Sequence, residues 1–136
     1  MKVTKRADAA LRAALGLSSP ALPAGSVLSV PELSRRSGVP APFLQQVLIA
    51  LRRAGVVASR GGRRGGYRLA RDPGEISVGD ILRGVQPDLA PMPCAADQGQ
   101  GTCPDAAGCR VRPVWVRVRE ATEAVINRTT LRELGA

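Results

Sequence analysis

Three cysteines are the side chains of this sequence best suited to metal or redox chemistry. Cys94, Cys103 and Cys109 follow a C-x8-C-x5-C pattern within a segment rich in proline, glycine and aspartate. Their odd number makes them a poor disulfide framework. Structural cysteines usually lie buried within helices or strands, so a cluster of thiols in a polar loop indicates a chemical role.

The spacing of these thiols leaves four interpretations open. A zinc site usually has four ligands and one C-x2–4-C pair, and the chain has neither such a pair nor any histidine. An iron–sulfur cluster tolerates looser spacing and can take a fourth ligand from another segment. A metal-free thiol switch and three incidental thiols are the remaining interpretations. The spacing alone favours a cluster.

Arginine is the second residue type with a clear chemical use. The formal net charge is +9, but residues 1–71 hold 13 basic and 2 acidic side chains, whereas residues 72–136 hold 7 and 9. Between Phe43 and Arg71 there are seven arginines and no acidic residue. Such a concentration of positive charge suits a polyanion. Because the chain has three aromatic residues, too few to stack on single-stranded nucleic acid, we expect double-stranded DNA as the partner.

Several other function classes fit the composition poorly. The absence of histidine removes imidazole-based triads and proton shuttles. The glycine-rich Gly61–Gly66 segment lacks the strand-to-helix context of a nucleotide-binding loop, so we expect no enzyme activity. Apolar runs stop far short of the ~18 residues of a membrane span, and no signal peptide is apparent. We therefore expect a cytoplasmic protein with reduced thiols.

The elements that carry the arginines predict a helix-turn-helix. Residues 5–17 have the composition and apolar spacing of a first helix. Ser29 with Glu32 three residues later is a capping signature for a short helix that ends at Gly38. A longer helix is expected from about Pro40 to Ala54. Two helices joined by a glycine-containing turn are typical of this motif.

The longer helix separates a buried face from a face available to DNA. Its predicted buried positions recur at helical spacing: Leu44, Val47, Leu48 and Leu51. The opposite face carries Ile49 and the polar or proline positions that we expect to contact DNA: Pro42, Gln45, Gln46, Arg52 and Arg53. Glutamine can pair with an adenine edge in the major groove.

A β-hairpin is predicted directly after this helix. Two strand-like pieces, at 56–59 and 67–69, flank a tip of glycine and arginine. Arg60, Arg63 and Arg64 at this tip can enter a minor groove or contact phosphates. The fold class expected is therefore mainly α with a small β-hairpin wing, a winged helix-turn-helix.

The C-terminal part predicts a short helix, a loop and a long helix. Ser77 caps a helix through Leu82, and a last helix runs from Pro113 to about Asn127. Its apolar stripe is expected to form a dimer interface, with packing on its own domain as the alternative: Val114, Val118, Ala121 and Val125. We expect residues 1–90 to form the DNA-binding domain, residues 91–112 the cysteine-containing cluster loop, and residues 113–136 the dimerisation helix and tail.

Several motifs together resemble the IscR/NsrR family of bacterial winged-helix regulators. They are Thr4, Asp8, Leu11 and Arg12, LSVPELSRRSGVP (28–40), FLQQVLIALRRAGVVASRGGRRGGYRLAR (43–71), ISVGDIL (76–82) and the three-cysteine loop. The resemblance covers nearly the whole chain. It implies a homodimer that binds a two-fold-symmetric operator, a last helix that forms the dimer interface, and an iron–sulfur cluster near that interface that tunes DNA affinity.

The resemblance also bears on the cluster ligands. The IscR branch ligates a [2Fe–2S] cluster with three cysteines and a histidine, which this chain lacks. The NsrR branch, repressors sensitive to nitric oxide, is similar to this chain in having aspartate in the first helix. It implies Cys94, Cys103 and Cys109 as ligands, with Asp8 from the other subunit as fourth ligand to a [4Fe–4S] cluster, favoured over [2Fe–2S]. Without the family, Asp8 is an ordinary i, i+4 partner of Arg12, worth ~0.3–0.5 kcal/mol.

The function implied is a repressor whose cluster senses nitric oxide or redox stress. Two alternatives keep the winged helix: a regulator with a metal-free thiol/disulfide switch, and a regulator of iron–sulfur biogenesis of the IscR type.

Overall fold

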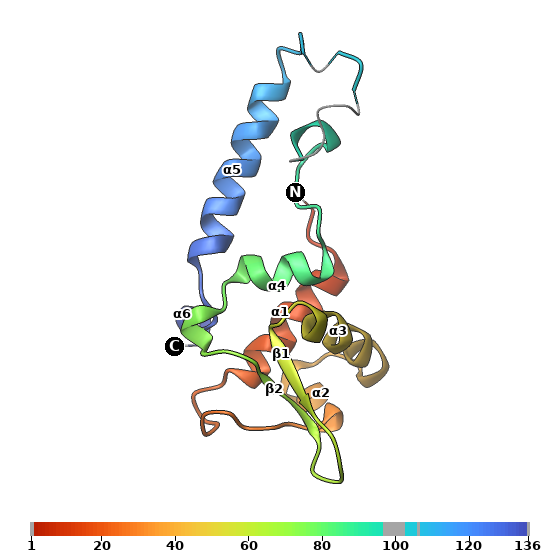
Figure 1. Cartoon of the computed structure of the whole chain (residues 1–136), viewed down its shortest axis with the longest axis vertical. Coiled ribbons are helices and arrows are strands. Elements are labelled where there is room, and N and C mark those ends of the chain that lie inside the picture. The colour runs from red at the N-terminus through yellow and green to blue at the C-terminus, as the bar shows by residue number, and fades with distance from the viewer. Residues whose placement is uncertain (1, 97–102, 106, 136) are drawn as a thin grey trace.

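The order of helices and strands is that of a winged helix-turn-helix followed by a long helix (Figure 1). The computed structural model describes residues 2–96, 103–105 and 107–135. Its N-terminal half holds α1 (Lys5–Leu17), α2 (Val30–Ser37), α3 (Ala41–Arg53), β1 (Val57–Arg60) and β2 (Gly66–Leu69). The chain continues through η1 (Pro73–Glu75), α4 (Val78–Val85), η2 (Pro93–Ala95), α5 (Arg112–Arg128) and α6 (Leu131–Gly135). The predicted fold class, mainly helical with one small antiparallel hairpin, is confirmed.

Local capping interactions begin and end the helices of the DNA-binding motif. The Ser29 hydroxyl accepts a hydrogen bond from the backbone N–H of Glu32 at 3.3 Å, and the Glu32 carboxylate accepts one from the Ser29 N–H at 3.2 Å. Gly38, with φ +73°, ends α2 in the left-handed conformation that glycine adopts without strain. Only Val39 and Pro40 separate Gly38 from the start of α3, so the turn between the two helices is short.

The same capping chemistry begins α4. The Ser77 hydroxyl accepts from the Asp80 N–H, and the Asp80 carboxylate accepts from the Ser77 N–H, each at 3.0 Å. The sequence predicts this helix only through Leu82, whereas α4 continues to Val85. The extension has a packing cause, since Val85 contacts both buried hydrophobic clusters.

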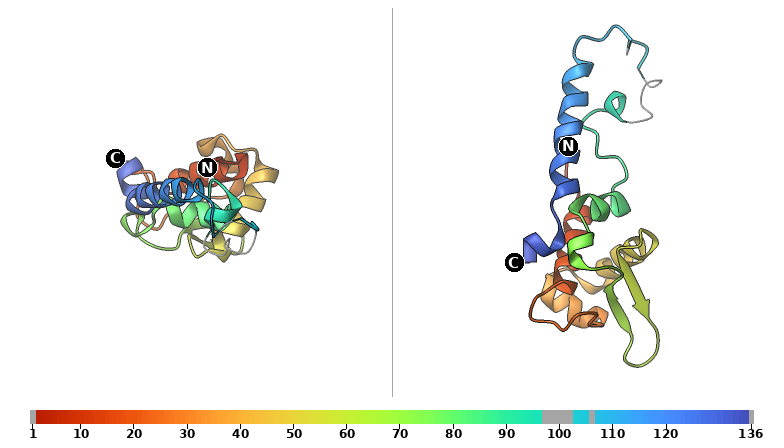
Figure 2. Two further views of the ribbon diagram at one scale, coloured as in Figure 1. Left: turned by 90° about the horizontal axis from the view of Figure 1, so that it is seen from above. Right: turned by 60° about the vertical axis from the view of Figure 1, so that its left-hand side comes forward.

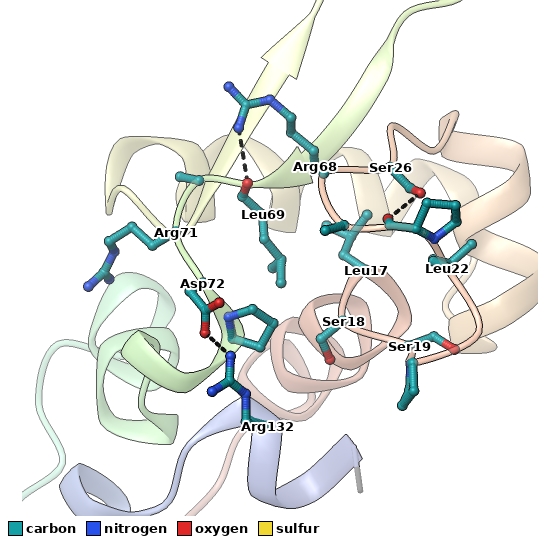
Figure 3. A pocket seen from close by; sticks show the side chains of 16 residues that line it. Leu17, Ser18, Ser19, Leu22, Ser26, Arg68, Leu69, Arg71, Asp72 and Arg132 are labelled. Carbon is teal, nitrogen blue, oxygen red and sulfur yellow. Dashed lines mark hydrogen bonds and ion pairs between the residues drawn. The ribbon is translucent and has the colours of Figure 1, made fainter.

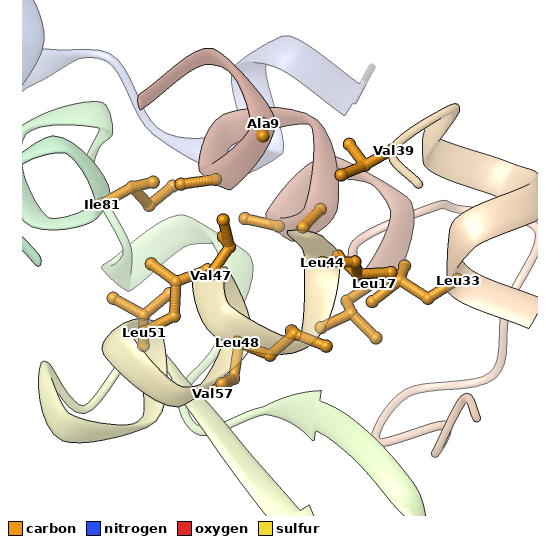
Figure 4. Close-up of a cluster of buried hydrophobic side chains, with 14 of the residues drawn as sticks. Ala9, Leu17, Leu33, Val39, Leu44, Val47, Leu48, Leu51, Val57 and Ile81 are labelled. Carbon is orange, nitrogen blue, oxygen red and sulfur yellow. The ribbon is translucent and has the colours of Figure 1, made fainter. Parts of the chain in front are cut away.

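The main hydrophobic core lies where α1, α2, α3 and α4 meet (Figure 4). The four side chains predicted to form the buried face of α3 are fully buried, which confirms that prediction: Leu44, Val47, Leu48 and Leu51. The facing side of α1 is lined by small buried side chains: Ala9, Ala10, Ala13 and Ala14. Burying one leucine or valine side chain stabilises the fold by ~1.5–3 kcal/mol, so this face fixes the orientation of α3.

The hairpin is held by the chain segment just before α2 and by contact of β1 with α3. β1 and β2 pair antiparallel, with Val57 opposite Leu69 and Arg60 opposite Gly66. On its other side β2 exchanges two backbone hydrogen bonds with Leu28, just before α2, between Leu28 and Tyr67 at 2.9 and 2.8 Å. The hairpin therefore has a fixed direction relative to α3.

The C-terminal helices leave the winged domain and return to it. α5 projects along the long axis of the molecule, and its far end lies beside the cysteine-bearing segment (Figure 2). α6, which the sequence analysis does not predict, returns: Leu131 is fully buried in the main core, and its N–H donates to the Ile76 carbonyl at 3.0 Å. Within the described residues, no helix combines the length and apolar character needed to cross a bilayer.

Candidate nucleic-acid interface and cysteine loop

The face of α3 opposite the core is exposed and polar. The positions predicted to contact DNA on this helix are all exposed: Pro42, Gln45, Gln46, Arg52 and Arg53. Because the buried seam of α3 is packed against α1 and α4, this face points away from the protein. A helix with such a face has the dimensions to enter a major groove of DNA.

The hairpin continues this surface. Arg60, Arg63 and Arg64 lie exposed at and beside its tip, and the guanidinium of Arg52 donates to the Ser59 hydroxyl at 3.5 Å. That contact links α3 to β1 across the base of the wing. The predicted DNA-contacting residues of helix and hairpin are thus exposed on two elements that contact each other.

The described residues between α4 and α5 include η2, which packs against α5 on the side of the molecule away from the hairpin (Figures 1 and 2). Cys94 lies in η2, and all three thiols are partly exposed and free of disulfides. The Arg112 side chain donates to the Cys94 carbonyl at 3.0 Å, which ties η2 to the first turn of α5. Residues 97–102 and 106, within the predicted cluster loop, lie outside the described residues.

Within the described residues of one chain, no preformed metal site is assembled. Over residues 2–96, 103–105 and 107–135, no three cysteine, aspartate or glutamate side chains are grouped closely enough to hold a metal ion. Asp8 instead lies on α1, paired with Arg12 at 2.8 Å. It borders a hollow of about 420 Å³ between the start of α1 and the turn that leads into α3.

The predicted interface stripe on α5 is exposed rather than packed on its own domain. Val114, Val118 and Val125 are 51%, 37% and 65% exposed, and Ala121 is also exposed. Val111, one turn earlier and 54% exposed, extends the stripe. Val111 is not among the predicted residues of the stripe, because the sequence predicts that this helix begins only at Pro113.

A second hollow lies between the end of α1, residues 18–26 and the end of β2, with a volume of about 510 Å³ (Figure 3). The arginines that line it bind groups of the protein itself. Arg68 donates to the carbonyl of the next residue at 3.2 Å, and Arg71 donates to a carbonyl of η1 at 3.1 Å. Arg132 of α6 pairs with Asp72. The last of these contacts holds α6 against the exit of the wing.

Comparison with protein families gives one match over almost the whole chain. Residues 3–136 match the profile of Rrf2, described as an iron-dependent transcriptional regulator. The chain belongs to the Rrf2 family. An rrf2-like protein of Rhodobacter capsulatus is 37% identical over 138 aligned residues, which cover 98% of this chain and 92% of that protein.

Solved structures of Rrf2-type regulators have the same fold. CymR (YrzC), the global cysteine regulator of B. subtilis, superposes with a TM-score of 0.75 at 27% identity, covering 99% of this chain and 96% of that one. IscR of T. potens gives 0.73 at 28% identity, covering 98% and 85%. This Rrf2 protein is thus a transcriptional regulator by family, built on the winged-helix fold of both neighbours.

Proposed function

We propose that this Rrf2 protein is a homodimeric transcriptional repressor that binds a two-fold-symmetric DNA operator. We further propose that an iron–sulfur cluster in its cysteine loop adjusts operator affinity in response to nitric oxide or redox stress. The observation that carries the DNA-binding part is the exposed polar face of α3 together with the exposed arginines of the hairpin that contacts it, the two elements being joined by the hydrogen bond from Arg52 to Ser59.

The two parts of this surface have different chemistry toward DNA. Gln45 and Gln46 carry amides that both donate and accept hydrogen bonds, so they suit base edges in the major groove. Arg60, Arg63 and Arg64 carry fixed positive charges that suit phosphates or a narrow minor groove. We therefore assign sequence preference to α3 and most of the salt-dependent affinity to the hairpin.

The dimer is supported by the exposed apolar stripe of α5. An exposed stripe of this kind on a long helix is typical of a helix that pairs with another copy. A two-fold axis at α5 presents two copies of α3 to one face of DNA, and the two must be separated by about one helical turn, ~34 Å.

The donor set fits an iron–sulfur cluster in chemical type. Cys94, Cys103 and Cys109 are free and partly exposed, and thiolates are the ligands such clusters prefer. The iron dependence in the description of the family supports this assignment. We propose these three as ligands, with Asp8 of the partner subunit as the fourth. When bound, a [4Fe–4S] cluster would supply an iron centre that reacts with nitric oxide.

A metal-free thiol switch is the second candidate. It is favoured by the observation that the described residues of one chain hold no group of three metal donors, whereas all three thiols are free to react. In this alternative, oxidation of the thiols changes the position of η2, which Arg112 ties to α5.

Anaerobic purification tests both candidates. Absorption and Mössbauer spectra of the purified protein reveal a cluster, and operator affinity is then measured during titration with a nitric-oxide donor. The proposal expects a coloured, iron-containing protein whose operator affinity changes as the cluster is lost. Unchanged affinity after loss of the cluster would refute the sensing role. A colourless protein whose affinity responds to peroxide would establish the thiol switch instead.

A further inference from the structure

Ile49 is an apolar side chain on an otherwise polar surface. It is 39% exposed and lies on α3 between Gln45 and Gln46, one turn before it, and Arg52 and Arg53, one turn after it. It therefore lies in the middle of the face that we assign to DNA.

Its exposure is unusual for this half of the molecule. The other large hydrophobic side chains that are exposed in the described part of the chain lie near the N-terminus, in the cysteine loop or on the C-terminal helices: Val3, Met92, Val111, Val114, Val118, Val125 and Leu134. From residue 4 to residue 91, Ile49 stands alone. Neither hydrophobic cluster includes Ile49, so it is not part of the packed core.

The major groove offers one apolar group that such a side chain can recognise. This group is the 5-methyl of thymine, whereas the other base edges present hydrogen-bond donors and acceptors. Isoleucine is β-branched, and in a helix its first side-chain torsion is nearly fixed. A methyl-sized apolar contact can therefore form at one base step without loss of much side-chain entropy.

We propose that Ile49 is a specificity-determining residue that contacts the 5-methyl group of a thymine in each half of the operator. The proposal rests on the proposed function, since it requires duplex DNA on this face of α3. In this proposal, the preference for thymine over cytosine or uracil at that position comes from apolar contact, whereas the flanking glutamines provide hydrogen bonds.

The first experiment defines the operator and then removes single methyl groups. The full-length protein selects duplexes from a random-sequence library, and each thymine of the selected site is replaced in turn by deoxyuridine, which lacks only the methyl. We expect one thymine in each half-site at which replacement weakens binding about fourfold, the value of one buried methyl-sized group. Replacing both should weaken it about 15-fold, the product of two equal effects.

The second experiment connects that methyl group to Ile49. In Ile49→Ala the same replacements should have a much smaller effect, because the side chain then ends at Cβ and no longer reaches the methyl group. Alanine favours helix and Ile49 lies outside the core, so the variant should fold. Leu134→Ala, an exposed apolar truncation on α6, is the matched control and should keep the full methyl dependence.

The outcomes separate this inference from the function it rests on. If every deoxyuridine replacement affects wild type and Ile49→Ala equally, the role of Ile49 is wrong although DNA binding stands. If the protein enriches no sequence from the library, the DNA-binding proposal itself fails and this inference falls with it.

Discussion

Asp8 is held in its own chain by an interaction too weak to explain a structural role. Its carboxylate pairs with Arg12 at 2.8 Å, and both side chains are more than half exposed. Exposed i, i+4 pairs contribute only ~0.3–0.5 kcal/mol. The fold therefore leaves this carboxylate available to a ligand, and the two roles can be separated by substitution.

We predict that Asp8→Ala and Arg12→Ala each lower the free energy of unfolding by no more than ~0.5 kcal/mol, because both remove the same surface pair. Only Asp8→Ala should lower the iron retained per chain after anaerobic reconstitution, since only it removes a donor. Urea unfolding and iron analysis measure the two effects. Equal iron content in both variants would exclude Asp8 as a ligand.

Arg60 and Gln46 should differ in the kind of DNA affinity they provide. Arg60→Ala is expected to weaken binding to all sequences and to reduce the slope of log K against log salt by ~1. Gln46→Ala should instead cost ~1–3 kcal/mol of discrimination on the selected operator and little on random DNA. Binding titrations at several salt concentrations check both. Equal losses on operator and random DNA for Gln46→Ala would contradict its role in base recognition.

Among the elements, the hairpin depends on a close backbone contact at the start of β2. A Cβ added at Gly66 would lie 2.1 Å from the Leu28 carbonyl oxygen, whereas one added at Gly61, near the tip, would meet no atom within 4 Å. The Leu28–Tyr67 hydrogen bonds next to Gly66 join the wing to the start of α2. Gly66 is therefore required for the direction of the wing, and Gly61 is not.

We predict that Gly66→Ala destabilises the protein by ~1–3 kcal/mol, the usual cost of a forced steric contact, and weakens DNA binding because the arginines of the hairpin are displaced. Gly61→Ala is the matched control and should change stability by less than ~0.5 kcal/mol. Thermal unfolding together with DNA titration measures both variants. Similar effects at the two glycines would show that the start of β2 tolerates the added carbon.

The α5 stripe should control association without affecting the fold of one chain. Val125→Glu places a charge at the most exposed valine of the stripe, so the free energy of unfolding of the monomer should change by less than ~0.5 kcal/mol while the dimer dissociates. Glu120→Lys, a charge change on another face of the same helix, should leave the dimer intact. Sedimentation equilibrium at micromolar concentration distinguishes them, and a Val125→Glu dimer of unchanged stability would place the interface elsewhere.

Elements were predictable where the signal was local. The Ser29–Glu32 and Ser77–Asp80 capping pairs, and the apolar spacing of α3, depend on neighbours within a few residues, and the structure confirms them. α6 was missed because its five residues carry little periodicity and are held by the distant contact of Leu131 with Ile76. The relation among the three cysteines is likewise non-local, since their spacing indicates the chemistry of a ligand set but not how the chain gathers it.

At the scale of the whole molecule, the surface proposed to contact DNA and η2, which holds Cys94, lie far apart along the long axis (Figures 1 and 2). A chemical change at the cysteines therefore cannot act on α3 by direct contact within one chain. Within one chain, a series of packed elements links the two sites: η2 contacts α5, α5 contacts α4, and α4 contacts α3. A second chain paired along α5 would add another route.

The elongated shape also separates charge. The half that carries the wing contains 13 basic and 2 acidic side chains in residues 1–71, while residues 72–136 carry a small net negative charge. The chain therefore has an electric dipole directed toward the wing. The field of a DNA duplex should rotate it during diffusion, so that encounters begin with the hairpin foremost.

Stopped-flow measurements can detect this electrostatic steering. The association rate constant should fall steeply as salt rises from about 50 to about 200 mM, because ions screen the field over ~10 Å, and a rate constant independent of salt would contradict it. Where pre-orientation operates, the search for a promoter proceeds with few unproductive collisions, and speed of arrival becomes a property of the overall charge distribution rather than of any single contact.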